Sequence, residues 1–160
     1  MPDLLMARRG ATLLDMEGAS VRRVLAVKPE GPWLVIASGA WAVESRHADT
    51  DTPFEISRIG LLPLLERPRE EVESQAREML RPGDPDFAEP LRAVVQCGLM
   101  ARSDYWVTRT LAWIISEEVE LFAELLREIA LGRGSQASQH AAKRLLKKNG
   151  LWSTNHRSPS

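Results

Sequence analysis

Hydrophobic and polar positions follow two different periods along the chain, and the change of period divides it into two halves. Through about residue 58 the apolar residues form short runs between turn-forming glycines and prolines, as in β-strands. After about residue 68 they recur every three or four residues, as in amphipathic helices. The pattern predicts an α+β protein in which a small N-terminal antiparallel sheet precedes four to five helices.

The best-defined strand is predicted over Trp33–Ser38, a run apolar enough to be covered on both faces of a sheet. The prolines and glycine of residues 28–32 predict a turn before it. Gly39 predicts a bulge after it, beyond which Ala40–Glu44 either continues the strand or pairs back on it. Turns this tight favour an antiparallel meander. The remaining strands are expected at Ala11–Met16, Val21–Val27, Ala40–Glu44 and Phe54–Ile59.

Five helices are expected in the second half, with the three after residue 103 best marked by capping residues. Ser103-Asp104 and Ser116 are expected N-caps, and Gly132 is expected to end a helix in the left-handed conformation. Leu151-Trp152 should fold back on the last helix as a hydrophobic cap. The helices are expected from Pro68 to Leu80, Glu89 to Arg102, Ser103 to Ile115, Ser116 to Leu131 and Ser135 to Lys148.

Trp106 and Trp113 are separated by seven positions on one of these helices, and a second amphipathic helix pair follows them. This arrangement resembles the stacked helix pairs of HEAT-like repeats from about Asp84 to Lys148. The resemblance implies helix stacking and assigns no functional residue. The two halves together predict a β subdomain over residues 1–66, a helical subdomain over 67–152 packed on it, and a flexible tail over 153–160.

Composition narrows the classes of function. The chain has 160 residues, which suffice for an independent core, and a formal net charge of −1, which argues against whole-protein binding to nucleic acid or anionic membrane. Its single cysteine, Cys97, excludes an internal disulfide and fits a cytoplasmic setting. Met1–Arg9 lacks the apolar run of a secretory signal, and no apolar run approaches the ~20 residues of a membrane span.

Three features are candidate sites of chemistry. His47, Asp49 and Asp51 alternate in a polar loop, so they can point the same way toward a divalent cation or a water, although such residues also form ordinary loops. Gly132-x-Gly134 follows no strand, so it predicts a helix end and not a phosphate-binding loop. Cys97 lies beside apolar residues and predicts a core position. No catalytic residue, cofactor or metal site is therefore expected.

Charge is segregated near the C-terminus. Residues 117–128 contain five glutamates and one arginine, whereas residues 131–160 contain no acidic residue. On the last helix the basic residues lie opposite an apolar side, where they can complement the helix dipole, an acidic protein or the phosphates of a nucleic acid. The predicted partner-binding residues are His140, Lys143, Arg144, Lys147 and Lys148, with Trp152 as an anchor.

The absence of catalytic motifs together with this charge pattern predicts a non-catalytic protein that binds another protein with an acidic surface, as an adaptor, an inhibitor or an immunity-type protein does. Two alternatives remain open. One is a small nucleic-acid-binding protein that uses the same basic helix. The other is a metal-dependent hydrolase centred on His47, Asp49 and Asp51.

Overall fold

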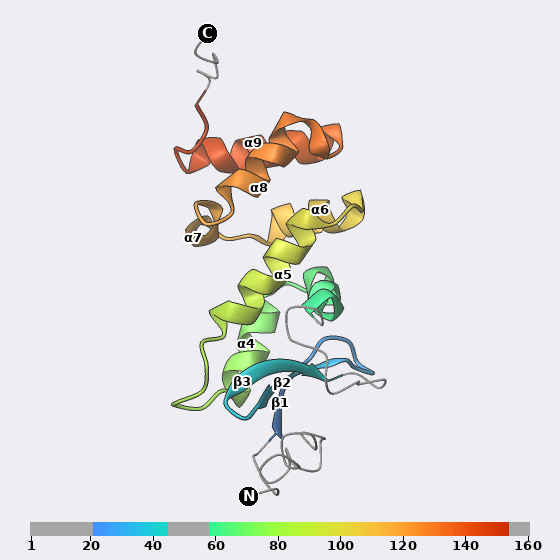
Figure 1. Cartoon of the computed structure of the whole chain (residues 1–160), viewed down its shortest axis with the longest axis vertical. Coiled ribbons are helices and arrows are strands. Elements are labelled where there is room, and N and C mark those ends of the chain that lie inside the picture. Colours follow the sequence, from blue (N-terminus) through green and yellow to red (C-terminus); the bar gives the residue numbers. More distant parts are fainter. Residues whose placement is uncertain (1–20, 45–57, 154–160) are drawn as a thin grey trace, which may run out of the picture. The chain divides into compact units, whose positions relative to one another are not determined.

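The computed structural model describes residues 21–44 and 58–153. A three-stranded antiparallel sheet comes first in the chain and is followed by helices, which confirms the predicted α+β class (Figure 1). The chain divides into two compact units, residues 1–94 and 95–160, which are described separately. The sequence pattern instead predicts a boundary between two subdomains after residue 66, and that boundary stays a prediction.

The strands β1 (Val21–Ala26), β2 (Trp33–Ala37) and β3 (Ala40–Glu44) pair in the order β1-β2-β3, which confirms the predicted meander. Ala37 pairs with Ala40, so β2 and β3 are joined by the two-residue turn Ser38-Gly39. Both turn residues have positive φ, 53° and 77°, which is typical of the turns that suit hairpins. Ala40–Glu44 therefore pairs back on β2, which confirms one of the two predicted alternatives, and the bulge predicted at Gly39 was wrong.

Burial along β2 confirms that both faces of this central strand are covered. Leu34, Val35, Ile36 and Ala37 are all buried although successive side chains point to opposite faces. Two further strands were expected, at Ala11–Met16 and Phe54–Ile59. The first strand and residues 54–57 of the second lie outside the described residues. Arg58 and Ile59 belong to the 3-10 segment η1 (Arg58–Glu66), so a strand reaching Ile59 was wrong.

Two helices follow η1 in this part of the chain. The apolar period of the sequence predicts Val72, Ala76 and Met79 on the inner side of helix α4 (Arg69–Met79). The structure buries Val72 and Ala76, whereas Met79 is 45% exposed. Helix α5 (Ala88–Met100) crosses the boundary between the two units and buries Leu91, Val94, Val95 and Leu99.

In the second unit the helices are α6 (Asp104–Trp113), α7 (Ser116–Val119), α8 (Ala123–Glu128) and α9 (Gln136–Lys148), with the π-type turn η2 (Ile129–Arg133) before α9. The sequence predicted one helix where the structure has α7, a turn and α8. Ser103 is the N-cap residue of α6, as predicted, although its side chain makes no cap hydrogen bond. The N-cap predicted at Ser116 was wrong, because Ser116 lies inside α7, after its N-cap Ile115.

The glycines around η2 explain how the chain turns into α9. Gly132 has a φ of 129°, which confirms the positive φ expected there because only glycine adopts such a conformation without strain. Gly134 is extended, and a Cβ atom added to it would lie 3.0 Å from the Ser138 Cβ and 3.2 Å from the Ile129 Cγ2. Close packing of η2 on the start of α9 therefore favours glycine here, because a larger residue would displace these neighbours.

Candidate functional site

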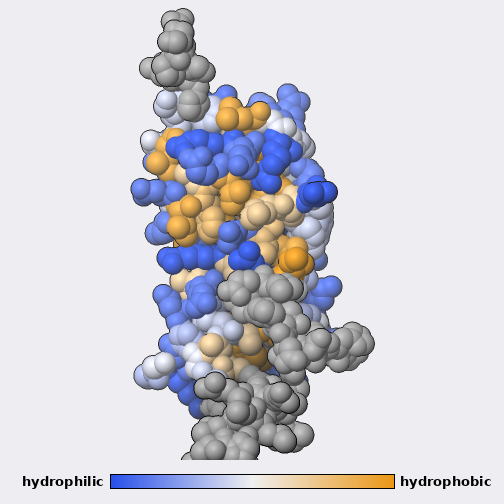
Figure 2. All heavy atoms as spheres, in the orientation of Figure 1, coloured by the Kyte–Doolittle hydropathy of each residue, from blue (hydrophilic) through white to orange (hydrophobic). Residues whose placement is uncertain are grey.

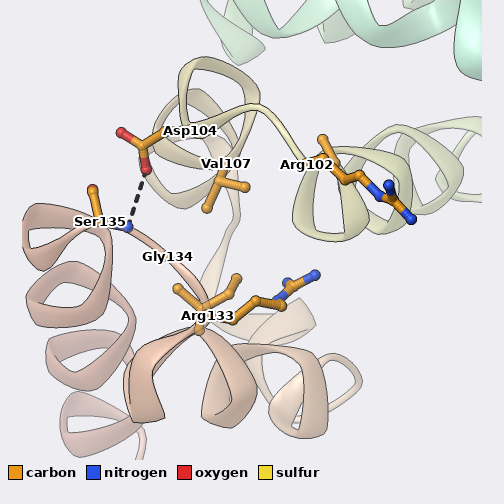
Figure 3. A pocket seen from close by; sticks show the side chains of 8 residues that line it. Arg102, Asp104, Val107, Arg133, Gly134 and Ser135 are labelled. Carbon is orange, nitrogen blue, oxygen red and sulfur yellow. Dashed lines mark hydrogen bonds between the residues drawn. The ribbon is translucent and has the colours of Figure 1, made fainter.

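Helix α9 is fixed at its first turn by side chains from two segments. Ser135 caps it, because the Ser135 Oγ accepts from the backbone N–H of Ser138 at 3.2 Å. From the start of α6, Asp104 Oδ1 accepts from the Ser135 N–H at 3.4 Å (Figure 3). The same oxygen accepts from the Ser138 hydroxyl at 2.8 Å. Asp104 thus joins α6 to the N-terminus of α9, where its negative charge is favourable.

The hydrogen bonds from Ser135 and Ser138 hold the pKa of the Asp104 carboxyl below its usual value. Its contribution to stability is therefore present at pH values above the ordinary Asp pKa of about 3.9. That contribution is lost as the pH falls through the lower pKa of the folded state.

We expect Asp104→Asn to lower the melting temperature at pH 7, because the amide group replaces a charged acceptor at a helix N-terminus. The difference in melting temperature between the variant and the original protein should shrink as the pH falls below about 4. Melting curves of both proteins at pH values from 7 to about 3 check this prediction. A difference that stays constant across the range would contradict it.

A hollow of about 240 Å³ lies beside this junction, and Figure 3 shows the side chains around it. Arg102 and Arg133 point away from the Asp104 carboxylate in this view, and Arg133 donates to the main-chain oxygen of Leu99. Asp104 and Arg133 already form hydrogen bonds within the protein. We therefore interpret this hollow as part of the junction between the helices. It is lined by Ala101, Arg102, Asp104, Val107, Ile129, Arg133, Gly134 and Ser135.

The C-terminus of α9 is closed by a Schellman motif. The Gly150 N–H donates to Lys147 O at 3.1 Å, the Leu151 N–H donates to Leu146 O at 2.8 Å, and Gly150 has a φ of 69°. Arg127 of α8 donates to Leu151 O at 3.2 Å and so holds the segment that follows α9. This confirms that the chain folds back at Leu151, as its sequence indicated.

The outer side of α9 carries the predicted basic residues. Ala142 and Leu146 are completely buried, while His140, Lys143, Arg144, Lys147 and Lys148 are all exposed. We call these five residues the basic face. Within the described ranges 21–44 and 58–153, none of them forms an ion pair. The face drawn in Figure 2 carries a hydrophilic band over the region of α8 and α9, with hydrophobic side chains beside it.

Four of the five basic residues surround a second hollow, of about 270 Å³, which the sequence did not reveal. Gln139 and the η2 residue Ala130 complete its lining, and Lys148 does not contribute. We call it the basic hollow; it is lined by Ala130, Gln139, His140, Lys143, Arg144 and Lys147. No acidic side chain is among these residues, so the hollow favours an anionic group.

Trp152, predicted as an anchor for a partner, packs within the unit. The Lys143 Nζ lies 5.1 Å from the centroid of its ring, at cation–π distance, and the ring is only partly exposed. The indole Nε1 is buried and finds no acceptor in the described part of the chain. The structure thus brings Trp152 to the basic face, and its role in binding stays a prediction.

The other candidate residues fall into two groups. His47, Asp49 and Asp51 lie outside the described residues, and no cluster of metal-binding side chains occurs among residues 21–44 and 58–153. Cys97 is partly buried within α5. In the same described ranges, no helix has the length and apolar character needed to cross a membrane.

Comparison with known proteins gives no relative: no protein-family model, curated protein or solved structure matches the chain.

Proposed function

We propose that this chain is a non-catalytic cytoplasmic protein that binds an acidic protein partner through the basic face of α9. The observation that carries the proposal is the exposure of five basic side chains on one helix without a compensating carboxylate among the described residues. Four of these side chains border a hollow that can receive an acidic group. Charges arranged in this way accelerate association and select the partner.

The rigid attachment of α9 supports the proposal. Hydrogen bonds at both ends of the helix, from Asp104 and Ser135 at the start and from Gly150 and Leu151 at the end, fix its orientation. A charged face on a fixed helix loses little conformational freedom on binding, since the backbone is already ordered.

Nucleic acid is less well supported as the partner. The net charge of the chain is −1, and the ring of Trp152, which lies beside the basic face, already has the Lys143 ammonium group over it. A nucleic-acid complex would weaken steeply with salt, by about 0.9 logarithmic units of affinity per unit of log salt for each phosphate contacted. A protein complex limited to a few ion pairs would weaken less.

We expect Arg144→Glu combined with Lys147→Glu to abolish capture of a stoichiometric protein partner by the tagged full-length chain. Both side chains are exposed and border the basic hollow, so reversal turns attraction into repulsion and leaves the core intact. The measurement is capture from a nuclease-treated lysate of the source organism, read by mass spectrometry. The melting temperature should stay unchanged.

The matched control is Arg77→Glu combined with Arg92→Glu. Both arginines are exposed, both lie within residues 1–94, and their reversal changes the net charge by the same amount. This variant should still capture the partner. Equal capture by the Arg144 and Lys147 variant would exclude the basic face as the binding surface, and loss of all partners on nuclease treatment would favour nucleic acid.

A further inference from the structure

A second charged surface lies in the same unit as α9. Four exposed glutamates lie on α7, on the turn that follows it and on α8, and the two on α8, Glu124 and Glu128, are one helical turn apart on the same side of that helix. The residues between them that point inward, such as Val119 and Leu126, are completely buried. We call the exposed set the acidic face; it consists of Glu117, Glu120, Leu121, Glu124 and Glu128.

The charges of the acidic face are mostly uncompensated. Glu124 pairs with Arg127 at 2.6 Å on the same helix, and this pair is exposed to solvent. Glu117, Glu120 and Glu128 form no ion pair with any residue of the described ranges. The acidic and basic faces of one molecule thus do not neutralise each other, and each is available to a second molecule.

The glutamates of α8 match the basic face in spacing. Basic residues recur on α9 at positions 140, 143 and 144, and 147, and glutamates recur at 117, 120, 124 and 128. The basic row on α9 repeats about once per helical turn, about every 5.4 Å along the helix, and Glu124 and Glu128 of α8 have the same spacing, whereas Glu117 and Glu120 belong to α7 and the turn after it. Glu124 and Glu128 can therefore pair in register with basic side chains on two successive turns of α9.

An apolar residue sits within the acidic face and matches the basic hollow in chemistry. Leu121 is 58% exposed and lies among the glutamates. The basic hollow offers Ala130 and the aliphatic stems of Lys143 and Lys147, which can cover a leucine while their charged ends stay at the rim. An apolar group surrounded by negative charges on one face can thus contact the aliphatic stems of positively charged side chains on the other.

We propose that the acidic face of one copy of this chain docks on the basic face of a second copy, with Leu121 entering the basic hollow. This inference rests on the proposed function and names its acidic partner as the chain itself. Because α8 and α9 belong to one unit, a two-fold arrangement pairs both faces twice and closes the assembly as a dimer. A net charge of −1 causes little electrostatic repulsion between two copies.

Another acidic helix, α4, fits this role less well. Glu71 pairs with Arg67 and Glu73 pairs with Arg69, each at 3.1 Å, so half of its glutamates are already compensated. Helix α4 also lies in the other unit of the chain. Its other glutamates, Glu70 and Glu78, form no ion pair with any described residue; both are exposed and serve as matched control positions.

The test is a charge exchange between the two faces, measured by sedimentation velocity of the full-length protein at about 50 mM and about 500 mM salt. The original protein should self-associate at low salt and less at high salt. Two variants, Arg144→Glu with Lys147→Glu and Glu120→Lys with Glu128→Lys, should each associate at least about tenfold more weakly. An equimolar mixture should restore association, because each variant then meets a face of opposite charge.

Two further variants separate the docking model from a general effect of charge. Glu70→Lys with Glu78→Lys makes the same change of net charge on α4 and should leave self-association unchanged. Leu121→Ser changes no charge and should weaken association about tenfold at both salt concentrations, because an apolar contact is not screened. Loss of association in the α4 variant, or a mixture that fails to restore it, overturns the proposal.

The failure of this inference is distinguishable from the failure of the proposed function. An original protein that stays monomeric at about 100 µM and low salt overturns self-docking. If the original protein then captures another protein, and the variant Arg144→Glu with Lys147→Glu does not, the basic face binds an external partner. If the variant captures everything that the original protein captures, both proposals fall.

Discussion

Replacing Trp41 with alanine is expected to lower the free energy of unfolding by about 3–5 kcal/mol. Trp41 lies on β3 and is only 4% exposed. Its indole Nε1 donates to the main-chain oxygen of Asp86 at 3.0 Å, and its ring lies 5.8 Å from that of Phe87. The substitution leaves a cavity, and it also leaves a partly buried carbonyl group without its hydrogen-bond donor. Both effects destabilise the first unit.

Urea denaturation of the full-length protein, followed by circular dichroism, measures this loss. Trp41→Phe is the control, because it keeps an aromatic ring in the core and removes the hydrogen bond. It should cost about 1–3 kcal/mol, the range for one unsatisfied buried group. If Trp41→Ala and Trp41→Phe have equal effects, the ring contributes nothing through packing and the prediction is wrong.

Local patterns in the sequence predicted most elements of the fold because each depends on neighbouring residues. The apolar run at Trp33–Ser38 and the turn residues before it specify a buried strand, and β2 is found there. The apolar period of Val72 and Ala76 specifies α4. The strand expected at residues 54–59 failed in its last two positions, since the pattern does not separate a short apolar strand from a 3-10 segment.

Predictions that depend on contacts distant in the sequence failed. Asp104 looked like a local cap for α6, and instead its carboxylate accepts the hydroxyl of Ser138, 34 positions away. Nothing in the local sequence marks that choice, because either helix N-terminus attracts a carboxylate. The break between α7 and α8 was missed because the apolar spacing continues through Phe122 without interruption.

The candidate surface could be predicted in part. The helical period placed Ala142 and Leu146 inside and the five basic residues outside, and the structure confirms this distribution. The basic hollow could not be predicted because Ala130 reaches it from η2, beyond the helix itself. A net charge of −1 likewise conceals two faces of opposite sign, since a sum over the chain contains no information about position.

Replacing Leu146 with alanine is expected to lower the free energy of unfolding by about 2–5 kcal/mol. Leu146 is completely buried on the inner side of α9, and the Leu146 main-chain oxygen also accepts from Leu151 in the motif that ends the helix. The alanine variant keeps this main-chain bond and every residue of the basic face, and it removes only the apolar anchor of α9. Its stability is measured by urea denaturation.

Leu146→Ala also separates two contributions to binding: the exposed side chains of the basic face, and the packing that holds α9 in place. At a temperature where α9 remains folded, the variant should bind like the original protein, because the exposed side chains are unchanged. Binding should then fail at a lower temperature than in the original protein, as α9 loses its packing. Leu131→Ala is the control: Leu131 is 67% exposed, and its removal should change the free energy of unfolding by less than about 0.5 kcal/mol. A comparable loss in both variants would contradict the assignment of Leu146 as the residue that holds α9 in place.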